Sequence, residues 1–209
     1  MLDFKAIGDA LIACDEDKVV ELVKDGLNAG VPAKDILNRG LIAGMDVVGE
    51  RMEKEEMFIP EVLMAAKAMS AAVNILKPLL AEGDVGAQGK VVIGTVKGDL
   101  HDIGKNLVAM LLESAGLEVY NIGVDVPPDK FVNEIQAKNA NILALSALLT
   151  TTMPMMKETV AAVTKAGIRG KVKILVGGAP VSQAYAAEIG ADGYAPDAGS
   201  AAKLAKSFL

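Results

Sequence analysis

The only histidine of this 209-residue chain lies in the stretch GTVKGDLHDIGKNLV, residues 94–108. His101 follows Asp99 by two positions and precedes Gly104 by three. A neutral imidazole can give one ring nitrogen to a metal ion while the N–H of its other nitrogen donates to a carboxylate, which fixes the tautomer and the direction of the ring. The stretch therefore has the residue types of a metal ligand and its acceptor. A surface-loop histidine is the competing interpretation.

Two carboxylates flank this histidine, and they favour different roles. Asp99 is the natural acceptor for the imidazole N–H, because separation by one residue within a turn lets the two side chains fold toward each other. Asp102 is the weaker candidate. A carboxylate near the N-terminus of the helix expected to begin at Ile103 complements the helix dipole, and this structural role is favoured for it.

From about residue 90, short β-branched or apolar runs alternate with helical segments. The runs are KVVIGTV, EVYNIG, NILALSAL, KILVGG and DGYAP, and the helical segments are expected to open near Ile103, Pro128, Met153, Val181 and Ala198. This alternation predicts right-handed βαβ units and a parallel sheet covered on both faces. Ligands bind such sheets beyond the carboxyl ends of the strands, where the His turn, SALLTTT (146–152) and GGAP (177–180) should converge.

Residues 1 to about 82 have helical periodicity throughout. Asp15 is placed to cap the helix EDKVVELVKDGLNAG, and Gly40 and Gly44 lie four apart, which allows close contact between helices. Four or five helices in this span indicate a small bundle.

Together these patterns predict an α+α/β chain. A helical cap domain over residues 1–85 is followed by a Gly-rich linker, GDVGAQGK, at 83–90. Residues 90–209 are predicted to form a Rossmann-like (flavodoxin-like), doubly wound, five-stranded parallel sheet.

Composition excludes several classes of function. A net charge of −6 without a Lys/Arg block, with three Tyr, four Phe and no Trp, argues against nucleic acid and anionic membranes as partners. The single cysteine, Cys14, rules out an intrachain disulfide. The first residues have no basic n-region, and charges, Gly or Thr interrupt the apolar stretches before membrane-spanning length. We therefore expect a soluble, cytoplasmic protein.

Three motifs in order carry a family resemblance. Asp99-Leu-His101-Asp-Ile-Gly104 is followed after 41 intervening residues by Ser146-Ala-Leu148, and after a further 28 by Gly177-Gly178. They resemble the cobalamin-binding signature Asp-x-His-x-x-Gly, Ser-x-Leu and Gly-Gly at its usual spacing. The resemblance covers nearly the whole chain, which is similar to the corrinoid proteins of anaerobic methyltransferase systems and to the cobalamin module of methionine synthase.

The resemblance implies a cobalamin or related corrinoid bound base-off, with His101 as the lower cobalt ligand and Asp99 and His101 as the catalytic pair. The nucleotide tail of the cofactor would enter the α/β domain, with Ser146 offering a hydroxyl and Leu148 an apolar wall. Thr152 would extend the His and Asp relay, although a helix N-cap explains this threonine equally well. The implied cofactor-binding residues are Gly98, Asp99, His101, Asp102, Ile103, Gly104, Ser146, Leu148, Thr150, Thr152, Gly177 and Gly178.

By the same resemblance, the helical half would shield the upper face of the corrin and move aside for transfer. The candidate covering residues are Met57, Phe58, Val62, Leu63 and Met64. Ordinary bundle core is the alternative, and it is expected to account for at least half of them.

The function implied is a methyl carrier of one-carbon metabolism, as in methanogenesis or acetogenesis. It would accept a methyl group on Co(I) from a substrate methyltransferase and deliver it from methyl-Co(III) to a second methyltransferase acting on a pterin (tetrahydrofolate) or a thiol (coenzyme M). A reductive reactivase is a further implied partner. The chain has no evident second site, so it is not expected to be catalytic without partners.

Three other functions are weighed against this one. A cobalamin-dependent sensor or regulator is the main alternative, although the chain has no DNA-binding domain, no upper-face His and no Trp. The small subunit of an adenosylcobalamin mutase shares the motifs but lacks the preceding helical cap. A flavodoxin-like or receiver domain without a corrin does not explain Ser-x-Leu and Gly-Gly at these spacings.

Overall fold

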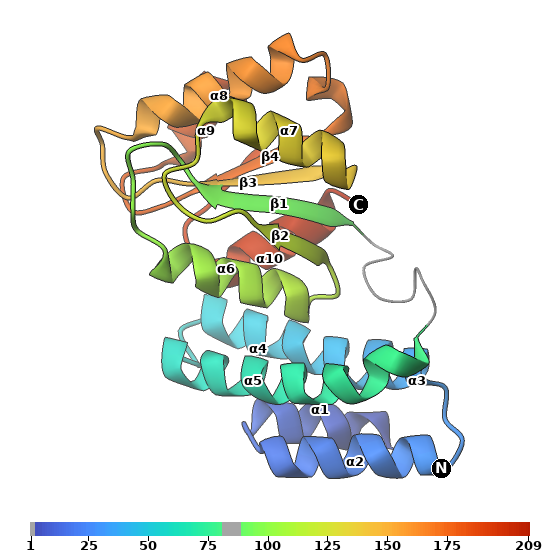
Figure 1. Ribbon diagram of the computed structural model, residues 1–209. Helices are drawn as coiled ribbons and strands as arrows, with labels where there is room; N and C mark the ends of the chain where they lie inside the picture. Colours follow the sequence, from blue (N-terminus) through green and yellow to red (C-terminus); the bar gives the residue numbers. More distant parts are fainter. Residues whose placement is uncertain (1–2, 81–88) are drawn as a thin grey trace. The chain divides into compact units, whose positions relative to one another are not determined.

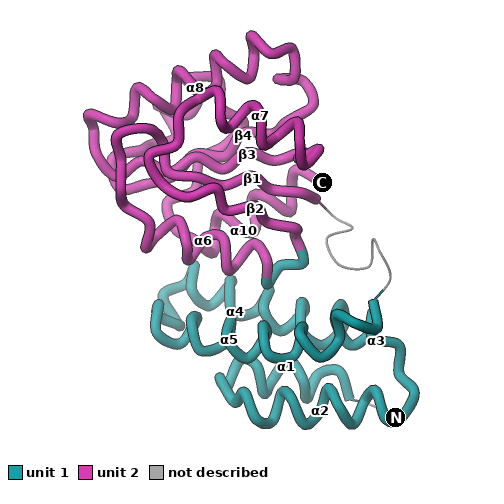
Figure 2. Tube along the Cα trace, in the orientation of Figure 1, with its two compact units in different colours: residues 1–87, 114–116 teal, residues 88–113, 117–209 magenta. Residues whose placement is uncertain are grey.

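The computed structural model describes residues 3–80 and 89–209. Contacts divide the chain into two compact units, coloured separately in Figure 2. The helical unit comprises residues 1–87 with 114–116, and the α/β unit comprises residues 88–113 with 117–209. Most of the predicted linker at 83–90 lies outside the described residues.

The helical unit is built from helices alone within its described residues (Figure 1). The Asp15 side chain accepts a hydrogen bond from the Lys18 amide and caps the second helix, as predicted. The third helical segment is continuous but changes its winding to a π-helix in its middle, which the apolar pattern does not predict. The elements are α1 (Phe4–Ile12), α2 (Glu16–Asn28), α3 (Ala33–Asp35), η1 (Ile36–Ile42), α4 (Ala43–Glu53), α5 (Ile59–Leu76) and η2 (Lys77–Leu79).

Glycines bring α1 and α4 into backbone contact. A Cβ atom on Gly44 would lie 2.8 Å from the Cα of Gly8, and one on Gly40 would lie 3.2 Å from the side chain of Ile7. The prediction of a close helix contact at Gly40 and Gly44 is therefore confirmed. Because no side chain separates the two backbones, their helices pack at a distance that larger residues would not permit.

Helix α5 corrects one expectation. With its extension it forms the segment Ile59–Leu79, which is long and apolar enough to cross a membrane by length and composition. The expectation that every apolar stretch stops short of that length is wrong here. A stripe of small and apolar side chains on α5, including Val62, Ala65 and Met69, is buried within the unit, and the core helix of a bundle meets the same criterion.

The α/β unit contains the predicted five-stranded, all-parallel sheet. Its strand order is β2-β1-β3-β4-β5, so the chain reverses direction across the sheet after β2. Valine, isoleucine and leucine dominate the central strands because both of their faces are buried. The strands are β1 (Lys90–Thr95), β2 (Glu118–Asn121), β3 (Ile142–Ser146), β4 (Lys173–Gly177) and β5 (Gly193–Ala195).

Helices cover both faces of this sheet. Figure 1 shows α6 and α10 on one face and α7 and α8 on the other. Four helices begin at the predicted residues, whereas α9 begins at Gln183 instead of Val181, because the Ser182 hydroxyl caps it by accepting from the Tyr185 amide. The elements are α6 (Ile103–Ser114), α7 (Pro128–Lys138), α8 (Met153–Lys165), η3 (Arg169–Lys171), α9 (Gln183–Ile189) and α10 (Ala198–Ser207).

The register of the central strands aligns their carboxyl ends. Thr95 at the end of β1 pairs with Ser146 at the end of β3, and Ser146 pairs with Gly177 at the end of β4. The loops that follow these three residues therefore leave the sheet side by side, at one edge. This alignment positions the site described below.

The contact between α1 and α4 leads to a paired prediction. Gly44→Ala should destabilise the protein by about 1 to 3 kcal/mol, because the new methyl group overpacks the contact with Gly8. Gly49→Ala lies on the same helix, but its new Cβ would meet no atom within 4 Å, so it should be neutral or stabilising by up to about 1 kcal/mol. Thermal unfolding followed by far-UV circular dichroism measures both. Equal melting temperatures for the two variants would contradict the packing argument.

Candidate functional site

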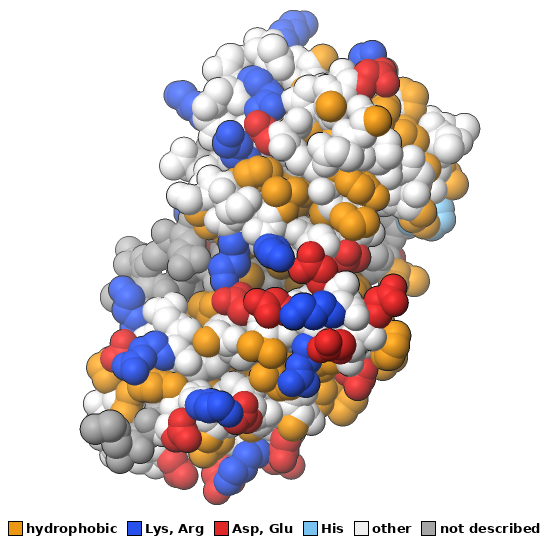
Figure 3. Space-filling view, turned by 180° about the vertical axis from the view of Figure 1, so that it is seen from behind, with side chains coloured by type: hydrophobic (Ala, Val, Ile, Leu, Met, Phe, Trp, Pro, Cys, Tyr) orange, Lys and Arg blue, Asp and Glu red, His pale blue; other side chains and the backbone are white. Residues whose placement is uncertain are grey.

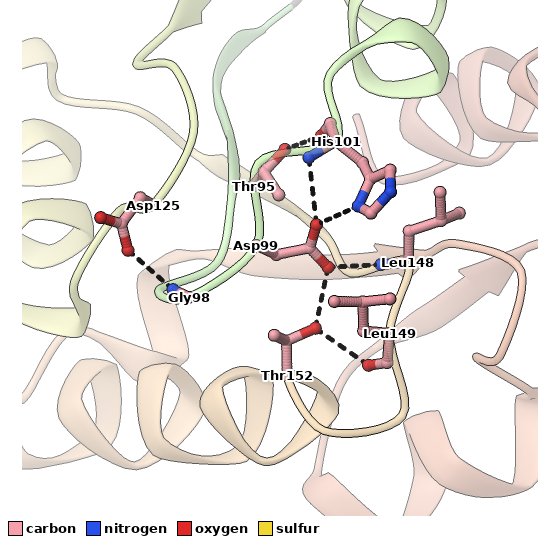
Figure 4. Close-up of polar contacts among 8 residues, drawn as sticks. All are labelled: Thr95, Gly98, Asp99, His101, Asp125, Leu148, Leu149 and Thr152. Carbon is pink, nitrogen blue, oxygen red and sulfur yellow. Dashed lines mark hydrogen bonds and ion pairs between the residues drawn. The ribbon is translucent and has the colours of Figure 1, made fainter.

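The site lies at the carboxyl edge of the sheet, where the loops after β1 and β3 meet (Figure 4). The carboxylate of Asp99 is its centre and is fully buried. One oxygen, Oδ1, accepts from the ring Nδ1 of His101 at 2.7 Å and from the His101 amide at 3.1 Å. The other, Oδ2, accepts from the Leu148 amide at 2.7 Å and from the Thr152 hydroxyl at 2.8 Å.

These four donors determine the charge of Asp99. Burial alone would raise its pKa, since removal from water penalises the charged form. The hydrogen bonds from the Leu148 amide, the His101 ring and amide, and the Thr152 hydroxyl outweigh burial and hold the pKa of Asp99 well below its usual range. Asp99 is therefore an anionic acceptor that carries no proton of its own.

The charge of Asp99 in turn fixes the imidazole of His101. A carboxylate can only accept, so the proton of the neutral ring must lie on Nδ1, which leaves a lone pair on Nε2. Nε2 has no hydrogen-bond partner among the residues that the structure describes. The side chain is half exposed and reaches the surface, where it is the pale blue group in Figure 3. His101 is thus prepared to ligate a metal ion through Nε2.

The contacts of Thr152 distinguish a role as helix N-cap from a role as hydrogen-bond partner of Asp99. It occupies the N-cap position of α8 but makes no side-chain cap hydrogen bond. Its hydroxyl lies instead 2.8 Å from Asp99 Oδ2 and 2.9 Å from the carbonyl oxygen of Leu149. The geometry therefore favours the contact with the carboxylate over the helix cap.

The glycines of the three motifs have different surroundings. A Cβ on Gly104 would meet nothing within 4 Å, so this position faces open space. Gly178 has a φ of +130°, and a Cβ there would lie 1.9 Å from the carbonyl oxygen of Ala147; one on Gly177 would lie 3.1 Å from the carbonyl oxygen of Ala195. At Gly178 the need for glycine thus comes from backbone packing against Ala147.

Other predicted residues surround this centre. Ser146 is partly buried and makes no side-chain hydrogen bond within the described part of the chain, so its hydroxyl is available to a ligand. Asp102 lies just before α6, where its carboxylate accepts a hydrogen bond from the Asn106 side chain, whereas the His101 ring is bound to Asp99. The remaining predicted residues Gly98, Ile103 and Thr150 are exposed near the His turn.

Sequence reasoning missed several contributors. Leu148 was predicted only as an apolar wall, yet its backbone amide binds Asp99. Thr95 donates to the carbonyl oxygen of His101 at 2.8 Å, and Asp125 accepts from the Gly98 amide at 2.7 Å. Backbone donors carry no sequence signal, although Thr95 lies near the end of one predicted strand and Asp125 lies two residues beyond the next one.

The predicted covering residues divide into two groups. Met57 and Val62 are buried in the helical unit and belong to its core. Phe58, Leu63 and Met64 are 63%, 40% and 55% exposed. The core interpretation thus accounts for two of the five, fewer than the half or more expected from the sequence.

The donor set indicates which kind of metal group fits. No group of three or more His, Cys, Asp or Glu side chains able to hold a metal ion exists within the described ranges. An ion at Nε2 of His101 would therefore obtain one ligand from the protein and the rest from its own cofactor, as in a macrocycle. Leu100 and Ile103, which are close to His101 in the sequence, expose large apolar side chains, at 72% and 86% exposure, as apolar ligand sites do.

Comparison with known proteins supports the same class of ligand. Two family models match the chain, each described as a B12 binding domain: one covers residues 89–203 and the other residues 4–77. A dimethylamine corrinoid protein of Methanosarcina barkeri is 45% identical over 204 residues, which span 97% of this chain and 95% of that protein.

Two solved structures extend the similarity to the whole fold. A cobalamin-binding protein from Desulfitobacterium hafniense has a TM-score of 0.86 and 33% identity, with complete coverage of both chains. A chain of the methanol:cobalamin methyltransferase complex from Methanosarcina barkeri has a TM-score of 0.83 and 32% identity, covering 98% of this chain and 78% of that one.

The hydrogen bonds to Asp99 predict a pH-dependent stability difference. Asp99→Asn replaces two acceptor oxygens by one acceptor and one donor, so at neutral pH it should destabilise the α/β unit by about 2 to 4 kcal/mol. Because the folded-state pKa is lowered, the carboxylate stabilises the fold fully above the unfolded-state pKa of about 4 and progressively less below it. The difference between wild type and variant should therefore shrink in acid.

Tyrosine fluorescence in urea is a suitable measurement, since the chain has no Trp and Tyr120, Tyr185 and Tyr194 all belong to the α/β unit. Asp129→Asn, at an exposed position at the start of α7, is the matched control and should change stability by less than about 0.5 kcal/mol. A stability difference for Asp99→Asn that is independent of pH would show that its carboxylate is not the stabilising species.

Proposed function

Because this chain belongs to the family of B12-binding corrinoid proteins, we propose that it is a methyl carrier that holds a corrinoid through His101. The observation that carries the proposal is the imidazole geometry: Nδ1 is bound to a buried carboxylate and Nε2 is left free. A surface-loop histidine has no need of a carboxylate partner that is itself held by donors from two loops.

The bound corrinoid supplies a cobalt ion that accepts a methyl group when reduced and gives it up to a second acceptor. When such a cofactor is bound base-off, His101 would be the residue that holds its cobalt ion, through Nε2. Asp99 holds the proton on Nδ1 and increases the basicity of Nε2. Leu148 and Thr152 keep Asp99 ionised and fixed in direction.

The rest of the cofactor would be held by the loops around this pair. Gly104 faces open space and lets the backbone approach the ligand. Ser146 offers a free hydroxyl, and Leu100 and Ile103 offer apolar contact. Further binding residues are Gly98, Asp102, Leu148, Thr150, Gly177 and Gly178.

The domain roles follow from the same proposal. Residues 90–209 form the cobalamin-binding domain, and residues 1–85 form a cap that shields the upper face of the corrin. The exposed side chains of Phe58, Leu63 and Met64 are the ones available for that contact. Met57 and Val62 are buried in the bundle and are not available for it.

The methyl donor and acceptor require partners. A dimethylamine corrinoid protein is among the relatives and a methanol:cobalamin methyltransferase complex is among the similar structures, which supports a substrate methyltransferase for a small methylated compound as one partner. A second methyltransferase acting on tetrahydrofolate or coenzyme M, and a reductive reactivase, complete the cycle in the cytoplasm.

Carrier function predicts stoichiometric, partner-dependent chemistry. Protein loaded with cobalamin and reduced should take up one methyl group per cobalt from methyl iodide, as followed by absorption spectroscopy. With dimethylamine or methanol it should show no uptake until a substrate methyltransferase is added. Multiple turnovers on either substrate by the chain alone would contradict the proposal.

Assignment of the ligand predicts a spectroscopic signature. In the Co(II) state, the axial 14N of His101 should split the cobalt lines of the electron paramagnetic resonance spectrum into triplets, and 15N-histidine should change them to doublets. Because the chain has one histidine, His101→Ala should abolish this pattern without replacement. Asp99→Asn should retain the ligand but weaken cofactor affinity by roughly 10 to 100-fold.

A splitting that 15N-histidine leaves unchanged would locate the axial nitrogen in the base of the cofactor, and the role of His101 would be wrong. Glu134→Ala, which removes a carboxylate from α7 far along the chain from the His turn, serves as the control and should leave the spectrum as in wild type.

A further inference from the structure

The turn that carries Asp99 is held by a residue from a distant part of the sequence. The β2–α7 loop, residues 122–127, runs beside it (Figure 4). The Oδ1 atom of Asp125 in this loop accepts from the Gly98 amide at 2.7 Å. In return, the Asp125 amide donates to the carbonyl oxygen of Asp99 at 3.0 Å.

Asp125 thus binds the turn at two consecutive residues, one through its side chain and one through its backbone. The Gly98 amide belongs to the peptide that precedes Gly98, and the Asp99 carbonyl belongs to the peptide that follows Asp99, so these two hydrogen bonds hold the turn on either side of the Gly98–Asp99 peptide. The Asp99 amide already donates to the carbonyl oxygen of Val96, which closes the turn itself. The two hydrogen bonds with Asp125 restrain the same turn from a different loop.

The backbone of Asp125 is held in an unusual conformation to make this contact. Its φ is +52°, in the left-handed region that residues other than glycine rarely adopt, although Asp and Asn enter it more readily than most. Gly98 opposite it also has a positive φ of +82°. Strained positions of this kind persist where the surrounding contacts require them.

A second set of hydrogen bonds anchors the start of the same loop. The buried ammonium of Lys105 on α6 donates to the side-chain oxygens of Asn106, at 2.5 Å, and Asn121, at 2.7 Å. The Asn121 oxygen also accepts from the Gly123 amide at 3.2 Å. Beyond Asp125, the Val126 amide donates to the carbonyl oxygen of Thr95 at 3.0 Å, so the loop is fixed on both sides of Asp125.

From this geometry we infer that Asp125 is a positioning residue for the cofactor ligand. Its side-chain oxygen sets the turn so that Asp99 meets Nδ1 of His101 and leaves Nε2 free. This inference rests on the proposed function of His101. It assigns to Asp125 the role of an acceptor, so that the charge of its carboxylate is not required.

Three substitutions separate the possible contributions of Asp125. Asp125→Asn keeps an acceptor oxygen and tolerates positive φ but removes the charge. Asp125→Gly keeps the backbone conformation without strain but removes the acceptor, and Asp125→Ala loses both. Asp129→Ala, at an exposed position on the first turn of α7, removes a neighbouring carboxylate and serves as the control.

Nuclear magnetic resonance of the cofactor-free protein provides two readouts. Hydrogen exchange of the Gly98 amide reports on the contact with Asp125. With 15N-histidine, the 15N chemical shifts of the single imidazole report which ring nitrogen carries the proton. A role limited to stability would not move this tautomer in a folded protein, and circular dichroism verifies folding.

We expect wild type, Asp125→Asn and the control to have a protected Gly98 amide and an imidazole protonated at Nδ1. Asp125→Gly and Asp125→Ala should exchange the Gly98 amide about tenfold faster or more and contain a substantial fraction of the Nε2–H tautomer. Asp125→Asn behaving like Asp125→Ala would overturn the acceptor role. Faster exchange with an unchanged tautomer would overturn the positioning role.

The same data test the proposed function separately. A wild-type imidazole protonated at Nε2 would contradict the role of His101 as ligand, whatever the variants show. In that case the Gly98 amide alone would decide whether Asp125 holds the turn: unchanged exchange in Asp125→Gly would exclude it.

Discussion

A buried carboxylate that must stay ionised is the constraint on which the site depends. Removing an unpaired carboxylate from water costs several kcal/mol, so Asp99 can be buried only where enough donors reach it. Its own turn provides two, the ring and amide of His101, and the loop after β3 provides the amide of Leu148 and the hydroxyl of Thr152. The sheet supplies this arrangement because β1 and β3 are neighbours whose carboxyl ends are in register. The ionised carboxylate fixes the proton of the imidazole on Nδ1. Because the sheet register brings the donors to that carboxylate, the sheet also determines which ring nitrogen is available to a ligand.

Within its described residues, the helical unit depends on close packing of its helices and not on a buried charge. Its interior combines Ile, Leu, Val and Met side chains with alanines, and α1 and α4 approach until the backbones of Gly8 and Gly44 touch. Small residues along α5 continue this close packing, while Phe58, Leu63 and Met64 remain at the surface. Because the interior is closely packed, these three exposed apolar side chains are not needed to fill it. Exposed apolar side chains of this kind are typical of surfaces that contact a ligand or a partner.

Much of the fold could be predicted from the sequence, and less of the site. Alternating apolar runs and helix starts predict the five-stranded parallel sheet because periodicity and local capping determine those elements. The spacing of Asp99 and His101 likewise predicts their hydrogen bond. Sequence reasoning fails where the backbone is the functional group: the amide of Leu148 reaches Asp99 only through the register of two strands. It also fails for the π-helical turn at Ile36–Ile42 and for the clash that requires glycine at position 178, since both depend on three-dimensional packing.

The strand order also has a consequence for the timing of assembly during synthesis. The acceptor Asp99 lies directly after β1, but two of its four donors lie about 50 residues later, beyond β2, α7 and β3. A growing chain that ends before Leu148 contains the motif around His101 without two of the four donors that keep Asp99 charged. Non-local contacts of this kind form late in folding, because the loop between them must first be closed. During synthesis, the only imidazole of the chain is therefore made before its direction is fixed. Cofactor binding requires the completed α/β unit.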